Sequence, residues 1–283
     1  MLYVVTAVHN RYSITEKFIS QIKMQSYQNL RLIIVDDGST DGTDDMIAKE
    51  APSAIVLHGN GNLWWGGALD KAYRWIKENS SENDSVFIAN DDSTFDSQYI
   101  ETGMMLLEKE PTILLTGCGY SVNSGKQIDG VRHWDFKKGG CADTIIPNDE
   151  GNCASTRSLF MRASTMMKVG GFHPILLPHY ASDFEWTIRA AKKGFRIKSY
   201  GTLTYRFDEG TTGDNNLSKV SLKKVFTKRS NLNPLYRVSF ILLSTPFRYL
   251  PEHLCYQIYR YLKKTPYVFS KINNSKSQRK GVK

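Results

Sequence analysis

The sequence contains few cysteines, and they form no recognisable metal-binding pattern. They include no C-x-x-C pair and have no nearby histidine at zinc-ligand spacing, which argues against a structural zinc site. A chain with this cysteine usage is typical of a reduced, cytoplasmic protein. The four cysteines are Cys118, Cys141, Cys153 and Cys255.

Long apolar runs are missing as well. The sequence opens directly on LYVVTAV, without the basic, apolar and small-residue series of a signal peptide. Its longest apolar stretch near the end, VSFILLSTPF, is much shorter than the roughly 20 residues that a membrane-spanning helix needs. We therefore expect neither a secretion signal nor a spanning helix.

Most of the chain also lacks an excess of positive charge. The formal net charge is +9, but the first 216 residues hold 22 lysines and arginines against 27 acidic residues. From Leu217 to Lys283 there are 15 lysines and arginines and one acidic residue, Glu252. The basic character belongs to this C-terminal segment, which has no recognisable nucleic-acid-binding module, so nucleic acid is not an expected partner.

Short apolar runs alternate with helix-period segments through the first 120 residues. This alternation predicts an α/β fold with a mostly parallel sheet flanked by helices, and ligand sites outside the carboxyl ends of the strands. A further helix is predicted at residues 182–193, ended by Gly194, with a strand at residues 195–200. The strands expected in the first part are LYVVTAV, RLIIV, AIVLH, SVFIA and TILLT.

Two pairs of aspartates follow predicted strands. Asp36 and Asp37 follow RLIIV, where a carboxylate can accept a hydrogen bond from a base N–H or a ribose hydroxyl. Asp91 and Asp92 follow SVFIA, and hard oxygen ligands at such a position suit Mn²⁺ or Mg²⁺ bridging a diphosphate. The alternative for the second pair is an ordinary turn built on Asn90 and Asp91.

Residues 37–48 also carry acidic and hydroxyl side chains at the spacing of a calcium-binding EF-hand loop. The twelfth position, which needs a bidentate glutamate, is Ala48, and a predicted strand precedes the loop instead of a helix. We therefore interpret Asp41, Asp44 and Asp45 as residues that favour the start of a helix.

A third acidic site lies in the helix predicted to begin at Ser182. Asp183 and Glu185 fall on opposite faces of this helix. Glu185 precedes Arg189 by four residues and is expected to form a surface ion pair with it. Asp183 is then left as the candidate general base, and its alternative role is to cap the helix, which Ser182 could do as well.

These motifs, in this order and spacing, resemble the family 2 glycosyltransferases. The family consists of inverting enzymes with the GT-A fold that use nucleotide-diphosphate sugars, and the likeness extends to rhamnosyltransferase-like enzymes of bacterial polysaccharide synthesis. It covers residues 1 to about 205. The stretches that carry it are TAVHNR, IIVDDGSTDGT, GNLWWGGALDKAY, ANDDSTF, GGFHP and SDFEW.

The resemblance implies a role for individual residues of these stretches. Asp183 would be the catalytic base, and Asp92 would hold Mn²⁺ or Mg²⁺. Ala7 and Asp36 would line the pocket for the nucleotide base, with Asp37 beside it. All the residues expected to bind substrate are Ala7, Asp36, Asp37, Asn62, Gly66, Gly67, Asp91 and Arg206.

The sequence departs from the family pattern at three places. The family's Glu-Asp pair reads Ser-Asp, which keeps Asp183 but loses its acidic neighbour. The metal-binding stretch reads NDD and not D-x-D, so Asp92 is preferred to Asp91 as the ligand. Relatives often have a metal- or diphosphate-binding histidine where this sequence has Tyr205 and Arg206, and Arg206 would then contact the diphosphate directly.

The resemblance also implies a domain organisation and a set of partners. A GT-A catalytic domain is expected over residues 1–216, with its nucleotide-binding half at about 1–118 and its acceptor-binding half at about 119–216. The expected donor is a UDP- or dTDP-sugar, and the expected acceptor is a glycan or lipid-linked glycan of a bacterial surface polysaccharide. The alternative is a non-catalytic sugar-nucleotide or glycan-binding module of the same fold.

The basic C-terminal segment, residues 217–283, mixes lysine and arginine with tyrosine, phenylalanine and leucine. Amphipathic sequence of this kind suits an anionic membrane surface, which would place the protein peripherally on the cytoplasmic face of the membrane. The alternative is a helical appendage that packs its apolar side on the catalytic body or on a second copy of the chain.

Overall fold

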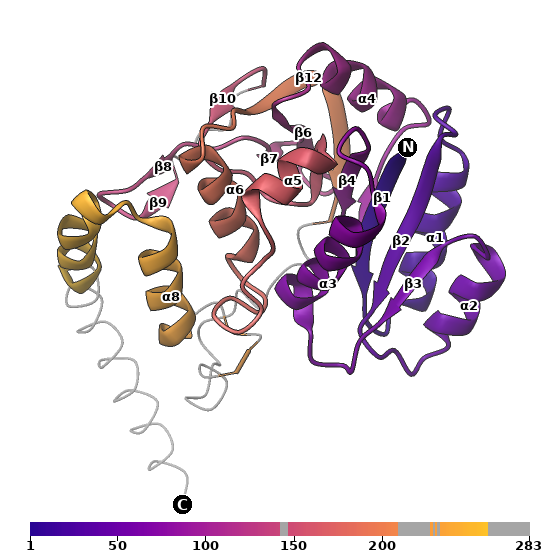
Figure 1. Ribbon diagram of the computed structural model, residues 1–283, viewed down its shortest axis with the longest axis horizontal. Helices are drawn as coiled ribbons and strands as arrows, with labels where there is room; N and C mark the ends of the chain where they lie inside the picture. Colours follow the sequence, from indigo (N-terminus) through magenta and orange to yellow (C-terminus); the bar gives the residue numbers. More distant parts are fainter. Residues whose placement is uncertain (142–146, 209–226, 229, 231–232, 260–283) are drawn as a thin grey trace, which may run out of the picture.

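A ten-stranded sheet organises the chain (Figure 1). The computed structural model describes residues 1–141, 147–208, 227–228, 230 and 233–259 of the 283-residue sequence. The main path through the sheet has the order β10-β12-β6-β11-β4-β1-β2-β3, with β5 paired to β12 and β7 paired to β6. The strands are β1 (Leu2–Val8), β2 (Leu30–Asp36), β3 (Ile55–His58), β4 (Ser85–Ala89), β5 (Ser93–Thr94), β6 (Leu114–Ser121), β7 (Gln127–Asp129), β10 (Glu150–Gly151), β11 (Ser158–Arg162) and β12 (Ile197–Phe207), with β8 (Trp134–Asp135) and β9 (Gly140–Cys141) in a separate hairpin.

Parallel pairing dominates the part of the sheet nearest the N-terminus. Strand β1 lies between β2 and β4 and is parallel to both, and β3 is parallel to β2. Strand β11 is inserted antiparallel between β4 and β6, while β12 runs parallel to β6. The predicted α/β fold with a mostly parallel sheet is confirmed, and the residues that follow β1, β2 and β4 meet at one edge of the sheet.

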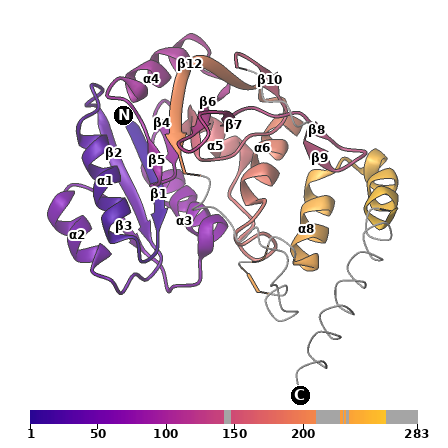
Figure 2. The same cartoon turned by 180° about the vertical axis from the view of Figure 1, so that it is seen from behind.

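Helices cover both faces of the sheet, as the opposite views of Figures 1 and 2 show. Successive residues of β1 point to opposite faces, so Val4 packs in one cluster with Phe18 of α1, and Val5 packs in the other with Leu69 of α3 and Trp186 of α6. The helices are α1 (Tyr12–Lys23), α2 (Thr43–Glu50) and α4 (Tyr99–Lys109) in the first layer, and α3 (Trp64–Asn79), α5 (Ala163–Val169) and α6 (Ser182–Lys192) in the second.

The helix predicted at residues 182–193 is confirmed as α6, and Gly194 follows it with a φ of +89°. The strand after it is longer than predicted. It continues to Phe207 because it pairs with β6 along most of its length and with β5 at its end.

A C-terminal helix packs on the body of the protein. Helix α8 (Pro234–Ser244) begins at Pro234, with the Asn233 side chain accepting a hydrogen bond from the Leu235 N–H at 3.1 Å. Its Phe240 ring lies edge-on to Trp134, with ring centroids 5.0 Å apart. A short 3₁₀ helix (Phe247–Tyr249) and helical residues 250–259 follow.

The predicted domain boundary at residues 216–217 and the end of the basic segment lie outside the described residues. Helix α8 belongs to this segment and packs on the body of the protein. This agrees with the predicted alternative of a helical appendage packed on the catalytic body. Across the ranges that the structure describes, no helix is both long enough and apolar enough to span a bilayer.

Candidate active site

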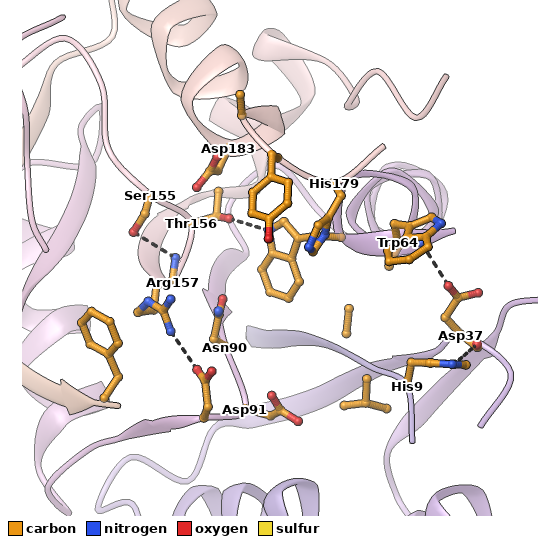
Figure 3. A pocket seen from close by; sticks show the side chains of 18 of the residues that line it. His9, Asp37, Trp64, Asn90, Asp91, Ser155, Thr156, Arg157, His179 and Asp183 are labelled. Atoms are coloured by element: carbon orange, nitrogen blue, oxygen red, sulfur yellow. Dashed lines mark hydrogen bonds and ion pairs between the residues drawn. The ribbon is translucent and has the colours of Figure 1, made fainter. Parts of the chain in front are cut away.

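A cavity of about 740 Å³ lies at the edge of the sheet where β1, β2 and β4 end (Figure 3). This size is typical of small-molecule sites, which span about 300–1,000 Å³. Its walls come from the segments after these strands, the start of α3, residues 155–157 before β11 and residues 179–184 at the start of α6. Elements from both halves of the chain therefore contribute side chains to one site.

Asp37 shapes one side of this cavity. Its two carboxylate oxygens accept hydrogen bonds from the backbone N–H groups of Gly61, Leu63 and Trp64 at 2.9, 2.8 and 3.0 Å. A carboxylate suits this place because the first N–H groups of a helix carry partial positive charge and have no partner inside the helix. Asp37 thus fixes the loop before α3 and the position of the Trp64 ring at the cavity wall.

Two aspartates and two arginines alternate at the end of β4. Asp91 lies 3.0 Å from Arg11 Nε and accepts a hydrogen bond from the Thr15 hydroxyl at 3.1 Å. Asp92 accepts a hydrogen bond from Arg157 Nη1 at 2.8 Å and lies 3.5 Å from Arg11 Nη2. Burial raises the pKa of Asp91 to about 6, although the Arg11 charge acts in the opposite direction.

This cluster fits a divalent cation that binds a diphosphate at the same time. Asp92 provides hard carboxylate oxygens on the cavity wall, the ligand type that Mn²⁺ and Mg²⁺ prefer. Arg11 Nε and Nη2 are buried and lie at ion-pair distances from Asp91 and Asp92. The oxygens of an anionic ligand in the cavity would compete with these two carboxylates for the Arg11 guanidinium.

Asp183 lies on the wall opposite Asp91, with its carboxylate facing the cavity (Figure 3). It is the second residue of α6, and its Oδ1 accepts a hydrogen bond from the Phe184 N–H at 2.9 Å. Burial raises the pKa of Asp183 to about 6, and the negative charge of Asp129 adds to the effect. A carboxylate with such a pKa is mostly ionised at neutral pH and is a stronger base than an exposed aspartate.

A sequence profile described as glycosyl transferase family 2 matches residues 3–166, which is more than half of the chain. The chain belongs to glycosyl transferase family 2. The resemblance inferred from the motifs is therefore confirmed, and the chain is a glycosyltransferase by family. A comparison with curated protein sequences found no match.

Several solved structures share the fold of this family 2 chain. A mannosyltransferase from Pyrobaculum calidifontis, in complex with GDP-Man and Mn²⁺, has 15% identity and a TM-score of 0.56 over 90% of this chain and 73% of its own. TarS from S. aureus has 14% identity and a TM-score of 0.59, over 88% and 50%. GalNAc-T7, with UDP, GalNAc and Mn²⁺, has 11% identity and a TM-score of 0.61, over 91% and 57%. The chain thus spans about half the length of the latter two.

The structure brings half of the predicted site residues of this glycosyltransferase to the cavity. The other five lie outside its lining. Arg206 is exposed on β12, because its neighbours Tyr205 and Phe207 point inward and side chains alternate along a strand. The predicted residues that line the cavity are Ala7, Asp37, Asp91, Asp92 and Asp183. Those that do not are Asp36, Asn62, Gly66, Gly67 and Arg206.

Asp36 turns away from the cavity and organises the loop after β2. It is buried, and its Oδ1 accepts hydrogen bonds from the Ser39 N–H and hydroxyl at 3.0 and 2.5 Å. Asp36, Asp44 and His58 could together hold a metal ion, since one ligand atom of each lies within 4.8 Å of the others. None of the three lines the cavity, and Asp44 and His58 are exposed.

The Gly66-Gly67 pair brings α3 close to the segment before α6. The Gly66 N–H donates to the Pro178 carbonyl at 2.8 Å, and a Cβ on Gly66 would lie 2.5 Å from the Leu177 carbonyl oxygen. The atoms nearest to a Cβ on Gly67 would be in the Leu63 and Pro174 side chains, at 3.3 Å or more. Gly66 therefore acts by allowing close backbone approach behind the cavity wall, which a contact with substrate does not require.

The expectation that Glu185 forms a surface pair was half wrong. Its carboxylate does bind Arg189, with Oε1 2.8 Å from Nε, but Glu185 is only 1% exposed. Arg189 also donates to the carbonyls of Val169 and Gly171, at 2.8 and 2.7 Å, so the end of α5 and the residues after it cover this face of α6. Glu185 does not line the cavity, which leaves Asp183 as the acidic residue of α6 that does.

Arg157 and Asp129 are cavity residues that the sequence analysis missed. Arg157 binds Asp92, lies 3.7 Å from Asp129 through Nε, and stacks over the Phe207 ring at 4.0 Å. Asp129 is itself fixed by a hydrogen bond from the Tyr205 hydroxyl at 2.8 Å. The available sequence signal was that Arg157 immediately precedes an apolar run. If this run is recognised as a strand antiparallel to β4, Arg157 is placed beside the end of β4.

Proposed function

We propose that this glycosyltransferase transfers a sugar from a nucleotide-diphosphate sugar to a hydroxyl group of a glycan or lipid-linked glycan, with inversion at the anomeric carbon. The observation that carries the proposal is the position of Asp183 across one cavity from the Asp91 and Asp92 pair. A base and a diphosphate-binding cluster on opposite walls suit a single in-line displacement between them.

In the proposed reaction each group in the cavity has a distinct task. Asp183 accepts the proton of the acceptor hydroxyl as its oxygen attacks the anomeric carbon, and the bond from that carbon to the diphosphate oxygen breaks. Arg11 and Arg157 donate hydrogen bonds to the diphosphate as its negative charge grows. Mn²⁺ or Mg²⁺, when held by Asp92, would supply further positive charge at the same oxygens.

The proposed donor is a UDP- or dTDP-sugar whose nucleotide base lies beside Ala7 and Asp37. The proposed catalytic domain ends near residue 216. Structures of the same fold that hold GDP-Man or UDP with Mn²⁺ support a nucleotide-bound state and a metal. The motif resemblance to bacterial polysaccharide enzymes supports a role in surface polysaccharide synthesis. Asp36, Asn62, Gly66, Gly67 and Arg206 would then act on the donor only indirectly.

A thermal-shift screen of UDP-, dTDP- and GDP-sugars with Mn²⁺ tests this donor assignment. A matching nucleotide sugar at 100 times its Kd is expected to raise Tm by about 5–10 °C, because a ligand that binds only the folded state stabilises it. Asp45→Asn, on the exposed side of α2, is the control and should respond as the wild type does. A shift with GDP-sugars alone would contradict the pyrimidine assignment, and no shift with any of them would contradict the donor site.

We further propose that the protein attaches to an anionic membrane through α8. Leu235, Val238 and Leu242 recur at helical spacing and are 67%, 50% and 56% exposed, so the described residues leave one apolar face of α8 uncovered. The C-terminal segment that contains α8 carries 15 lysines and arginines and a single acidic residue. An apolar helix face within a segment of such composition fits the surface of an anionic bilayer.

Liposome sedimentation measures this attachment. With vesicles that contain about a third anionic lipid, replacing the three exposed residues of α8 by serine is expected to lower binding at least about tenfold, because each loses apolar burial in the bilayer. Met105→Ser, an exposed apolar residue on α4, is the matched control and should bind normally. Equal binding of the triple variant, or a doubled mass in solution that the triple variant loses, would contradict attachment and favour self-association.

A further inference from the structure

A second cavity, of about 270 Å³, lies next to the one that contains Asp183. It is lined by the β8–β9 hairpin, the start of α6, helix α8 and helical residues 253–257. Tyr180, Ala181 and Phe184 line both cavities. The residues on either side of Asp183 in the chain therefore form a wall shared by the two sites.

We propose that this second cavity is an acceptor subsite that binds one sugar ring of the acceptor glycan. The inference rests on the proposed transfer reaction, in which the attacking hydroxyl must reach Asp183. In that reaction the donor occupies the side of the first cavity at the ends of β1, β2 and β4, so the acceptor has to approach from the α6 side, where the two cavities share their wall.

Aromatic rings form a large part of the cavity wall. The Trp134 ring is edge-on to Phe240, with centroids 5.0 Å apart, and 6.5 Å from the Phe184 ring. Tyr180 and Tyr236 complete the aromatic lining. Flat rings of this kind pack well against the C–H face of a pyranose, and the volume is of the size needed for one such ring with its substituents.

Polar groups in the cavity distinguish a sugar from a lipid chain. Trp134 Nε1 is buried, and no described residue accepts a hydrogen bond from it. A sugar hydroxyl can accept this hydrogen bond, whereas an alkyl or isoprenoid chain would leave the donor unsatisfied. Arg237 adds further donors to the lining, which a ring bearing several hydroxyl groups can also use.

The backbone between the two cavities is held in an unusual conformation. Ala181 has a φ of +64°, in the left-handed region that residues with a Cβ rarely adopt. It immediately precedes the first turn of α6, which contains both Asp183 and Phe184. Backbone strain of this kind is concentrated at functional sites, and here it sets the base and the shared aromatic wall relative to each other.

Saturation-transfer NMR with a panel of methyl pyranosides tests the proposal on the full chain, with UDP and Mn²⁺ present. The panel contains the glucose, galactose, mannose, rhamnose, N-acetylglucosamine and N-acetylgalactosamine derivatives. At least one is expected to bind, and Trp134→Phe, which removes the N–H and keeps an aromatic ring, should weaken it about five- to tenfold. Trp75→Phe, on α3 and outside both cavities, is the matched control.

Arg237→Ala provides a second variant, because this exposed residue can be changed without disturbing the core. Arg237→Ala is also expected to weaken pyranoside binding several-fold. If Trp134→Phe lowers Tm, Arg237→Ala becomes the deciding variant. No binding by any pyranoside, or binding unchanged in the deciding variant, would overturn the proposal. The UDP-induced thermal shift is measured on the same samples: its absence beside Trp134-dependent pyranoside binding would defeat the proposed donor site but not the subsite.

Discussion

Replacing Asp183 with asparagine is expected to lower the rate of sugar transfer by about 10²–10⁴-fold, the range that a general base contributes. Asparagine cannot accept the proton of the acceptor hydroxyl, but it preserves the shape of the side chain. Donor affinity should stay within about twofold of wild type, since the variant leaves Asp91, on the opposite wall, and its neighbour Asp92 unchanged. Transfer kinetics and calorimetric titration of the nucleotide sugar measure the two effects.

The pKa of Asp183 provides an independent check on this role. Because burial raises this pKa to about 6, the base is protonated and inactive below that pH, so kcat/KM of the wild type should fall about tenfold per pH unit there. A folded-state pKa above the usual value also means that the ionised carboxylate disfavours the folded state as pH rises through about 6. Asp183→Asn should therefore show no loss of Tm at pH 7.5, and a variant that is folded and fully active would disprove the base role.

Replacing Asp92 with asparagine is expected to uncouple metal binding from donor binding. In the wild type, Mn²⁺ should tighten UDP binding by at least about tenfold, because a cation held by Asp92 would attract the negatively charged diphosphate. The variant should lose this tightening. Its metal-free affinity for UDP should be equal or higher, because Arg157 and Arg11 lose an acidic neighbour that competes with the diphosphate for them. Titration of UDP with Mn²⁺ or with a chelator, and electron paramagnetic resonance of bound Mn²⁺, give both quantities without any activity assay.

Asp44→Asn is the control that separates the two candidate metal positions. Asp44 belongs to the group with Asp36 and His58, outside the cavity, and is exposed, so its replacement should preserve the fold and the effect of Mn²⁺ on UDP binding. If Asp44→Asn abolishes the effect and Asp92→Asn does not, the metal is held by that other group and the assignment of Asp92 fails.

The sheet and the acidic residues at its edge could be predicted because both follow from local patterns. Apolar runs at regular intervals indicate parallel strands, and the ends of such strands meet at one edge whatever the details of packing. This is why Asp37, Asp91 and Asp92 were expected together. Asp36 shows the limit of the argument: adjacent side chains point in different directions, and only the loop conformation after β2 decides that Asp37 and not Asp36 faces the cavity.

Residues whose position depends on non-local pairing could not be placed from the sequence. Arg157 reaches Asp92 only because β11 is inserted antiparallel beside β4, about 70 residues later in the chain. Arg206 was expected at the diphosphate, but the register of β12 against β6 buries Tyr205 and Phe207 and exposes the arginine between them. The spacing of Glu185 and Arg189 predicted their pairing correctly but contained no information about the segment that buries it.

The most direct test of the proposed function is acceptor-free cleavage of the donor. The wild type is incubated with Mn²⁺ and the nucleotide sugar that gives the largest thermal shift, and phosphorus NMR follows the release of the nucleoside diphosphate. Slow release is expected, with water in place of the acceptor, and it should decrease below about pH 6 and be lost in Asp183→Asn. Binding of the nucleotide sugar without any release would contradict catalysis and identify a sugar-nucleotide-binding module of the same fold.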